Sequence, residues 1–194
     1  MAVASETTNC FDVSRFFLAK SDESNIPVTN LKLQKLVYYA QAFYLAIEGK
    51  ALFDDLIEAW DHGPVAVDLY HECKRYGKNA IPYDHDFNED VFSSEQLTVL
   101  NLVFEMQGRK CAWTLRQQTH QEYPWLCHSE DGEVADGAEI TQEEMRDYFS
   151  KFVVSDQYVN EYLEAANNAI EDRGILLPDT INNADDFVAW IKEN

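Results

Sequence analysis

Histidine and cysteine residues that lie close together are the first candidates for chemistry, because both are common zinc ligands. His71 and Cys73 are two positions apart on a predicted helix, so their side chains point to different faces. Cys127 and His128 are adjacent, and the sequence contains neither a Cys-x-x-Cys nor a His-Glu-x-x-His motif. These spacings predict no metal site, and we expect no other cofactor.

His62, Gly63 and Pro64 could form a catalytic loop, but glycine and proline also supply the backbone angles of a turn. We therefore interpret them as a turn between a strand and a helix. The sequence has no Gly-x-Ser-x-Gly elbow, no Walker loop and no glycine-rich dinucleotide turn. Pairs of carboxylates occur throughout so acidic a chain and carry no information. The chain is expected not to be an enzyme, and no catalytic residue is assigned.

The element that must position any functional side chains is the strongest predicted helix, Leu31 to Glu48. Thr29 or Asn30 can cap its start, and Gly49 suits its end. Apolar residues recur on it at helical spacing: Leu33, Leu36, Val37, Ala40, Phe43, Tyr44 and Ile47. Four polar residues share the helix: Lys32, Gln34, Lys35 and Gln41. Packing does not specify them, so they are either surface contacts or buried groups with satisfied hydrogen bonds, and both interpretations stay open.

The other elements are predicted from caps, glycines and prolines. Helices are expected over residues 12–20, from Pro64 in a first turn to Gly77, 93–108, 112–120 and 141–152. Ser93 with Gln96, and Thr141 with Glu144, have the spacing of capping boxes. Leu56 to Trp60 is predicted to be a short strand, with Trp60 a core or rim anchor. An acidic loop is expected over residues 81–92, a break at Tyr123-Pro124-Trp125, and a mobile loop over 129–138.

Acidic residues dominate the charge: 35 Asp and Glu against 15 Lys and Arg give a net charge of −20. Direct binding to a nucleic-acid backbone is therefore not expected. The charge can steer a basic protein partner or simply maintain solubility. Ordered carboxylates could also imitate DNA phosphates, which makes an acidic inhibitor of a nucleic-acid-acting defence enzyme the alternative function.

Three motifs occur in order along the chain. The first is Thr29 to Leu36 (TNLKLQKL) followed by Tyr38 to Gln41 (YYAQ). The second combines Ile57 to Trp60 with Gly63 to Val65, Leu69-Tyr70 and Tyr76-Gly77. The third consists of Thr119-His120, Glu122, Pro124-Trp125, Ile140-Thr141 and Tyr148-Phe149. Together the three motifs resemble the Panacea domain family of SocA-like antitoxins. The resemblance covers about Asp12 to Phe152, and three ordered motifs are more specific than one short match.

The resemblance implies a largely helical antitoxin that neutralises a toxin enzyme by direct binding. Family members neutralise many unrelated toxins, including alarmone-synthetase-like enzymes, and the namesake also delivers its toxin to a protease. A cognate protein toxin is therefore the expected partner, with a cellular protease as an implied second one. The family has Tyr-Gly where this chain has Gln107-Gly108, and Ala-Arg where it has Cys127-His128. Any partner contact made by that arginine is absent here.

The expected fold is mainly α: a compact helical domain with a short β element over residues 12–154, and a C-terminal helical extension over 155–194. The extension either caps the core or presents an amphipathic face to the toxin. The predicted partner-binding residues are Lys32, Lys35, Gln41, Trp60, His62, Tyr162, Phe187 and Trp190. No long apolar run and no signal-like start is visible, so a cytoplasmic location away from membranes is expected.

Overall fold

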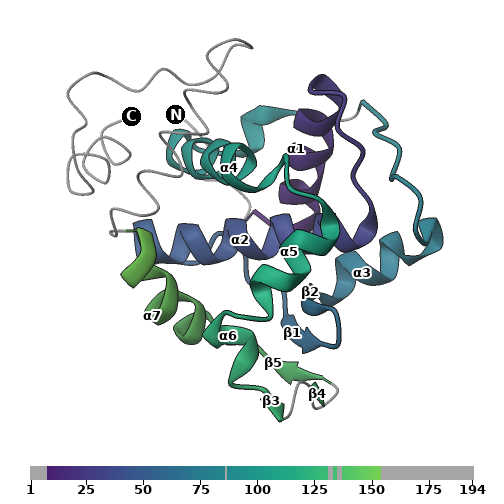
Figure 1. Cartoon of the computed structure of the whole chain (residues 1–194). Coiled ribbons are helices and arrows are strands. Elements are labelled where there is room, and N and C mark those ends of the chain that lie inside the picture. Colours follow the sequence, from purple (N-terminus) through teal and green to yellow (C-terminus); the bar gives the residue numbers. More distant parts are fainter. Residues whose placement is uncertain (1–7, 86, 131–132, 135–136, 154–194) are drawn as a thin grey trace.

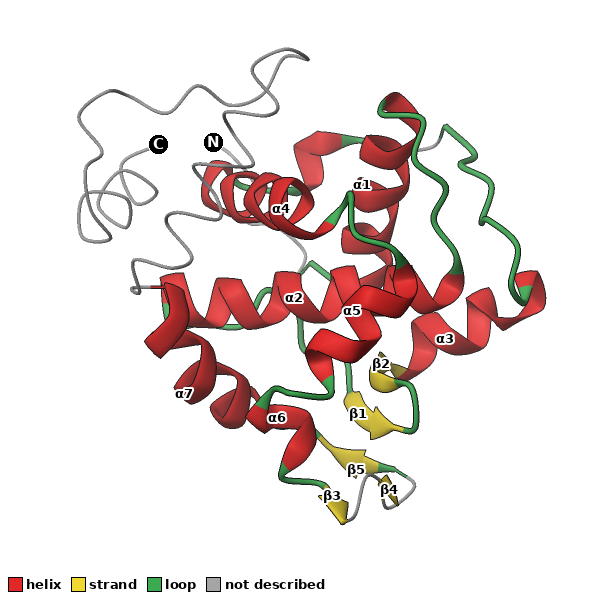
Figure 2. Cartoon of the chain, in the orientation of Figure 1, coloured by secondary structure: helices red, strands yellow, loops and turns green. Residues whose placement is uncertain are grey.

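The computed structural model describes residues 8–85, 87–130, 133–134 and 137–153. This part of the chain is mainly helical with a small antiparallel sheet, as predicted (Figure 1; Figure 2). Its α-helices are α1 (Cys10–Glu23), α2 (Asn30–Glu48), α3 (Val67–Cys73), α4 (Ser94–Gln107), α5 (Ala112–Thr119), α6 (Tyr123–Leu126) and α7 (Gln142–Val153). Two 3-10 turns are η1 (Lys74–Tyr76) and η2 (Glu89–Val91).

Helix α2 is the centre of the fold. It contacts α1 and α4 on one side, α7 on another, and α5 with the sheet on a third (Figure 1). Sixteen of its 19 residues are buried, so its polar positions lie inside the protein together with its apolar ones. The predicted stripe accounts for the apolar contacts, while the polar positions need hydrogen-bond partners within the fold.

Aromatic rings join α2 to α7. The Phe149 ring lies 5.6 Å from that of Phe43 and 5.9 Å from that of Tyr38, measured between centroids. Met145 and Phe149 are buried in this contact, so they form the core face of α7. Edge and tilted ring geometries of this kind stabilise a core beyond the apolar area they bury.

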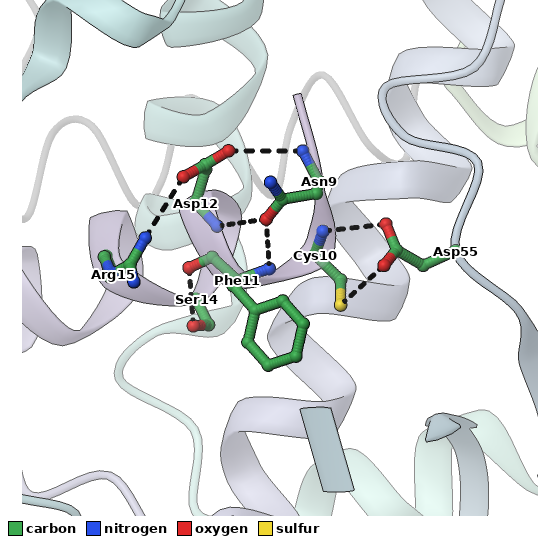
Figure 3. A network of polar contacts seen from close by, with 7 residues as sticks. All are labelled: Asn9, Cys10, Phe11, Asp12, Ser14, Arg15 and Asp55. Carbon is green, nitrogen blue, oxygen red and sulfur yellow. Dashed lines mark hydrogen bonds and ion pairs between the residues drawn. The ribbon is translucent and has the colours of Figure 1, made fainter. Parts of the chain in front are cut away.

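A polar network fixes the start of α1 (Figure 3). The Asn9 side chain accepts hydrogen bonds from the backbone of Phe11 and Asp12, both at 3.0 Å, and Asp12 accepts one from Asn9. The helix therefore begins at Cys10, two residues before the predicted start. Cys10 donates through its backbone and its thiol to Asp55, which ties the segment after α2 to α1. Burial, reinforced by Asp55, raises the pKa of Cys10, so its thiol stays a donor.

The main sheet has the order β2-β1-β5, all antiparallel, with β1 (Ile57–Trp60), β2 (Gly63–Ala66) and β5 (Ala138–Glu139). Strand β1 was predicted, but the placement of Pro64 in the first turn of a helix is wrong. Pro64 lies in β2, opposite Ala59, and α3 begins only at Val67. Proline has no N–H to donate, and β2 tolerates it because it is an edge strand.

The segment predicted as a mobile loop over residues 129–138 contributes to two sheets. Strand β3 (Ser129–Glu130) pairs with β4 (Glu133–Val134), and β5 pairs with the second edge of β1. The break expected at Tyr123 instead starts α6, because Pro124 occupies the first helical turn, where a missing N–H costs nothing. The acidic loop over 81–92 includes η2.

Both predicted capping boxes are confirmed. Ser93 and Gln96 exchange hydrogen bonds at the start of α4. Thr141 donates its backbone N–H to Glu144 at 2.7 Å and accepts from the Glu144 backbone at 3.2 Å. The predicted C-terminal extension over 155–194 lies outside the described residues, so the domain boundary stays a prediction. Among the described helices, none has the length and apolar character needed to cross a membrane.

Candidate interaction surface at the β1–β2 turn

The buried amides of α2 hold other segments against the helix. Gln41 donates to the Phe53 carbonyl at 2.8 Å and accepts from the backbone N–H groups of Leu52 and Phe53. Gln34 accepts from the Ala66 backbone in β2 at 2.9 Å. For these residues, the question left open by the sequence is answered: they are buried groups with satisfied hydrogen bonds.

Lys35 lies directly under the β1–β2 turn. Its ammonium donates to the Pro64 carbonyl at 2.8 Å, and its side chain is fully buried. Burial, and the nearby charge of Arg116, lowers the pKa of Lys35 to about 7, although Glu122 acts in the opposite direction. Lys35 and Gln41, both predicted to contact a partner, therefore lie inside the fold. Lys32, the third predicted partner-binding residue on α2, is buried as well, with 4% of its surface exposed, and burial lowers its pKa.

Glu122, at the start of α6, is a second buried ionisable group. It accepts hydrogen bonds from the Tyr39 hydroxyl at 2.8 Å and the Tyr38 hydroxyl at 3.4 Å. These bonds favour the charged form, but burial outweighs them and raises the pKa of Glu122 to about 8. The tyrosine pair of the first family motif therefore helps to hold the start of α6 against α2.

Aromatic contacts from α6 complete the support of the turn. Trp125 donates its indole N–H to the Trp60 carbonyl at 2.9 Å. His120 stacks on the Trp125 ring, with centroids 3.8 Å apart and planes 21° from parallel. Burial, with the charge of Arg116 next in effect, lowers the pKa of His120 to about 4, so this ring is neutral at physiological pH.

The turn carries exposed side chains above this support. Asp61 and His62 are exposed at its tip, and Arg116 of α5 donates to the Asp61 carbonyl at 3.1 Å and to His62 Nδ1 at 3.3 Å. The Arg116 guanidinium also lies over the Trp113 ring, 4.8 Å from its centroid. The Trp113 ring is 56% exposed, which is unusual for tryptophan.

A cleft of about 360 Å³ opens beside the turn, between the start of α2 and α3. Its lining includes Trp60, His62, Val65, Tyr70 and Lys74. The Trp60 and Tyr70 rings meet edge to face at 4.7 Å, and Trp60 also donates to Glu58. We use the name turn surface for Trp60, Asp61, His62, Tyr70, Trp113 and Arg116.

The structure brings two predicted partner-binding residues, Trp60 and His62, to one surface. Tyr162, Phe187 and Trp190 lie outside the described residues. Sequence reasoning did not identify Trp113 or Arg116. Their only signal was a large aromatic residue three positions before an arginine on a short helix, which does not reveal whether other elements cover that face.

Residues 33–126 match the family model described as Antitoxin SocA-like, Panacea domain. Residues 33–126 are a SocA-like Panacea domain. This Panacea domain runs from α2 to α6, and it contains Lys35, the β1–β2 turn, Glu122 and the turn surface.

The chain is 40% identical over 87 residues to a protein named Antitoxin SocA from Caulobacter vibrioides (strain NA1000 / CB15N). The match covers 45% of this chain and 46% of that relative, so it spans less than half of either protein. No solved structure matches the chain. Helices α1 and α7 lie outside the family match and pack against α2.

Proposed function

We propose that this chain is an antitoxin that neutralises a protein toxin by direct, stoichiometric binding. The observation that carries the proposal is the SocA-like Panacea domain over residues 33–126, together with a relative named as an antitoxin. The chain acts by occupying its partner and not by catalysing a reaction. Its toxin is an enzyme, and delivery of that toxin to a cellular protease is a second role implied by the family resemblance.

The turn surface is the part of the described chain that we propose contacts the toxin. Tryptophan, tyrosine and arginine are the residue types that most often dominate binding energy, and all three occur here. Lys35, Glu122 and Trp125 fix the backbone beneath them, so little conformational freedom is lost on binding. Arg116 and Lys74 place positive charge on this side of a strongly acidic protein.

The C-terminal segment is the second proposed contact. The family match ends at residue 126, and a surface that selects one toxin among many must differ between relatives. Tyr162, Phe187 and Trp190 supply aromatic anchors in that segment. We propose that they contribute toxin selectivity while the turn surface contributes a shared contact.

A pull-down of the full chain from its native host tests the proposal. A protein that co-purifies in stoichiometric amount should arrest growth when expressed alone, and co-expression of this chain should restore growth. The acidic inhibitor is the competing function. A DNA-binding enzyme that is released from the chain by DNA or by salt would support that competitor and contradict the antitoxin role.

A further inference from the structure

Three residues with metal-binding side chains meet between α6 and α7. Cys127 follows the last residue of α6, His128 comes next, and Glu144 lies in the first turn of α7. One ligand atom from each lies within 4.8 Å of the other two. The spacing of Cys127 and His128 predicted no metal site, because the two adjacent residues match no zinc motif and Glu144 is 16 positions beyond His128.

Two of the distances in the cluster are close to those between ligands of a small tetrahedral ion. Cys127 Sγ lies 3.6 Å from Glu144 Oε1, and His128 Nε2 lies 3.2 Å from Glu144 Oε2. Ligand atoms around tetrahedral zinc are about 3.3–3.6 Å apart, which follows from the usual zinc–sulfur, zinc–nitrogen and zinc–oxygen bond lengths. The two distances end on different oxygens of Glu144, and the set of three ligand atoms lies within 4.8 Å, so side-chain rotations must close the remaining gap around one ion.

Glu144 is held in position before any ion binds. Thr141 donates to it through the backbone N–H at 2.7 Å and through the hydroxyl at 2.9 Å. Burial opposes ionisation, but these bonds and the one to His128 outweigh it and lower the pKa of Glu144. A carboxylate that is already ionised and oriented by neighbouring donors is a prepared metal ligand.

We propose that Cys127, His128 and Glu144 bind one Zn²⁺ ion. A thiolate, an imidazole and a carboxylate together favour zinc over calcium or magnesium, which prefer oxygen ligands alone. The His128 and Glu144 side chains are 20% and 25% exposed and Cys127 is exposed, so water can supply the fourth ligand. The ion would tie the end of α6 to the start of α7. The proposal is independent of the antitoxin role, because the chain alone carries all three ligands.

Zinc binds cysteine as the thiolate, so the Cys127 thiol proton is released to solvent when the zinc–sulfur bond forms.

The test is a titration of the untagged, reduced full chain with Co²⁺, followed by displacement with Zn²⁺. The wild type should bind one ion per chain and show the intense near-ultraviolet band of a thiolate–cobalt bond. Cys127→Ser should lose that band, and His128→Ala should weaken binding by about tenfold or more, since even outer-shell changes cost this much. Cys111→Ser is the matched control, because Cys111 is the other exposed thiol described.

Circular dichroism of each variant establishes that it is folded before binding is compared. The proposal is overturned if folded Cys127→Ser retains the wild-type affinity, or if the band disappears with Cys111→Ser. It is equally overturned if the wild type binds cobalt without a thiolate band, since the ion would then be held by carboxylates elsewhere on this acidic surface.

Discussion

The ammonium of Lys35 and the carbonyl of Pro64 meet at 2.8 Å, although the two residues are 29 positions apart. This bond joins the second turn of α2 to an edge strand through a backbone carbonyl. Gly63 allows it, because a Cβ there would lie 2.6 Å from the Thr119 hydroxyl and 2.8 Å from Lys35 Cε. The β1–β2 turn is thus held from beneath by Lys35. A lysine that contacts a partner would be exposed, whereas Lys35 is fully buried.

Gly63→Ala should destabilise the fold strongly. Its φ of +95° strains any side chain, and the added methyl group would overlap Thr119 and Lys35. We expect the free energy of unfolding to fall by about 2–5 kcal/mol, measured by urea denaturation. Gly49→Ala is the control: it has a φ of +70° with nothing within 4 Å, and should cost about 1–2 kcal/mol. Equal losses in both variants would show that the turn is not closely packed.

Gln41→Leu should lower the free energy of unfolding by about 3 kcal/mol or more. The change leaves the backbone groups of Leu52 and Phe53 without their side-chain partner inside the protein. Gln142→Leu, at an exposed position on α7, is the control and should have little effect. A stable Gln41→Leu protein with impaired toxin binding would instead place Gln41 in the interface.

Glu122 makes stability depend on pH in a direction opposite to that of a salt-bridged carboxylate. Its pKa is raised from 4.5 to about 8 in the folded protein, so the unfolded chain ionises first as pH rises. The folded protein then binds more protons than the unfolded chain, and the free energy of unfolding falls between these two pH values.

Denaturation of Glu122→Gln between pH 4.5 and about 7 tests this assignment. Lys35, whose folded pKa is about 7, is protonated in both states below that value. His120, whose pKa is lowered from 6.5 to about 4, adds a rise in stability in the same window, but it does so in both proteins, so the difference between the two pH profiles isolates Glu122. Glu122→Gln should show a smaller fall in stability across the window than the wild type. The exposed Glu143→Gln variant should retain the wild-type fall. An unchanged pH profile in Glu122→Gln would mean that Glu122 is ionised in the folded state.

Much of the helical fold could be predicted from the sequence because its signals are local. The apolar spacing along α2 and the capping boxes of α4 and α7 involve residues within one or two turns of each other. Pro64 was misplaced because proline suits both a first helical turn and an edge strand, and only the pairing with Ala59 decides between them.

The turn surface and its buried support were harder to predict, because they depend on contacts between segments that are distant in the sequence. Lys35 and Gln41 could not be assigned, since their partners are backbone atoms in β2 and in the segment before β1. Trp113 was missed because its exposure depends on which elements leave one face of α5 uncovered. Trp60 and His62 could be named from the sequence because they lie beside and within a recognisable turn, and their contact with a partner stays a prediction.

Trp113→Ala and Arg116→Ala should each weaken toxin binding by about 2 kcal/mol or more, which is roughly thirtyfold, without loss of stability. Both side chains lie on the turn surface, and neither packs in the core. Val91→Ala is the control, because Val91 is 43% exposed and lies outside the turn surface. Wild-type affinity in both turn-surface variants would move the interface to another part of the chain.

The most direct test of the antitoxin proposal is a calorimetric titration of the co-purified toxin with the full chain, run beside an assay of the toxin's activity. We predict saturation at a fixed stoichiometry and a loss of toxin activity that follows the bound fraction. Growth rescue in cells without any measurable binding of the purified proteins would contradict neutralisation by direct contact.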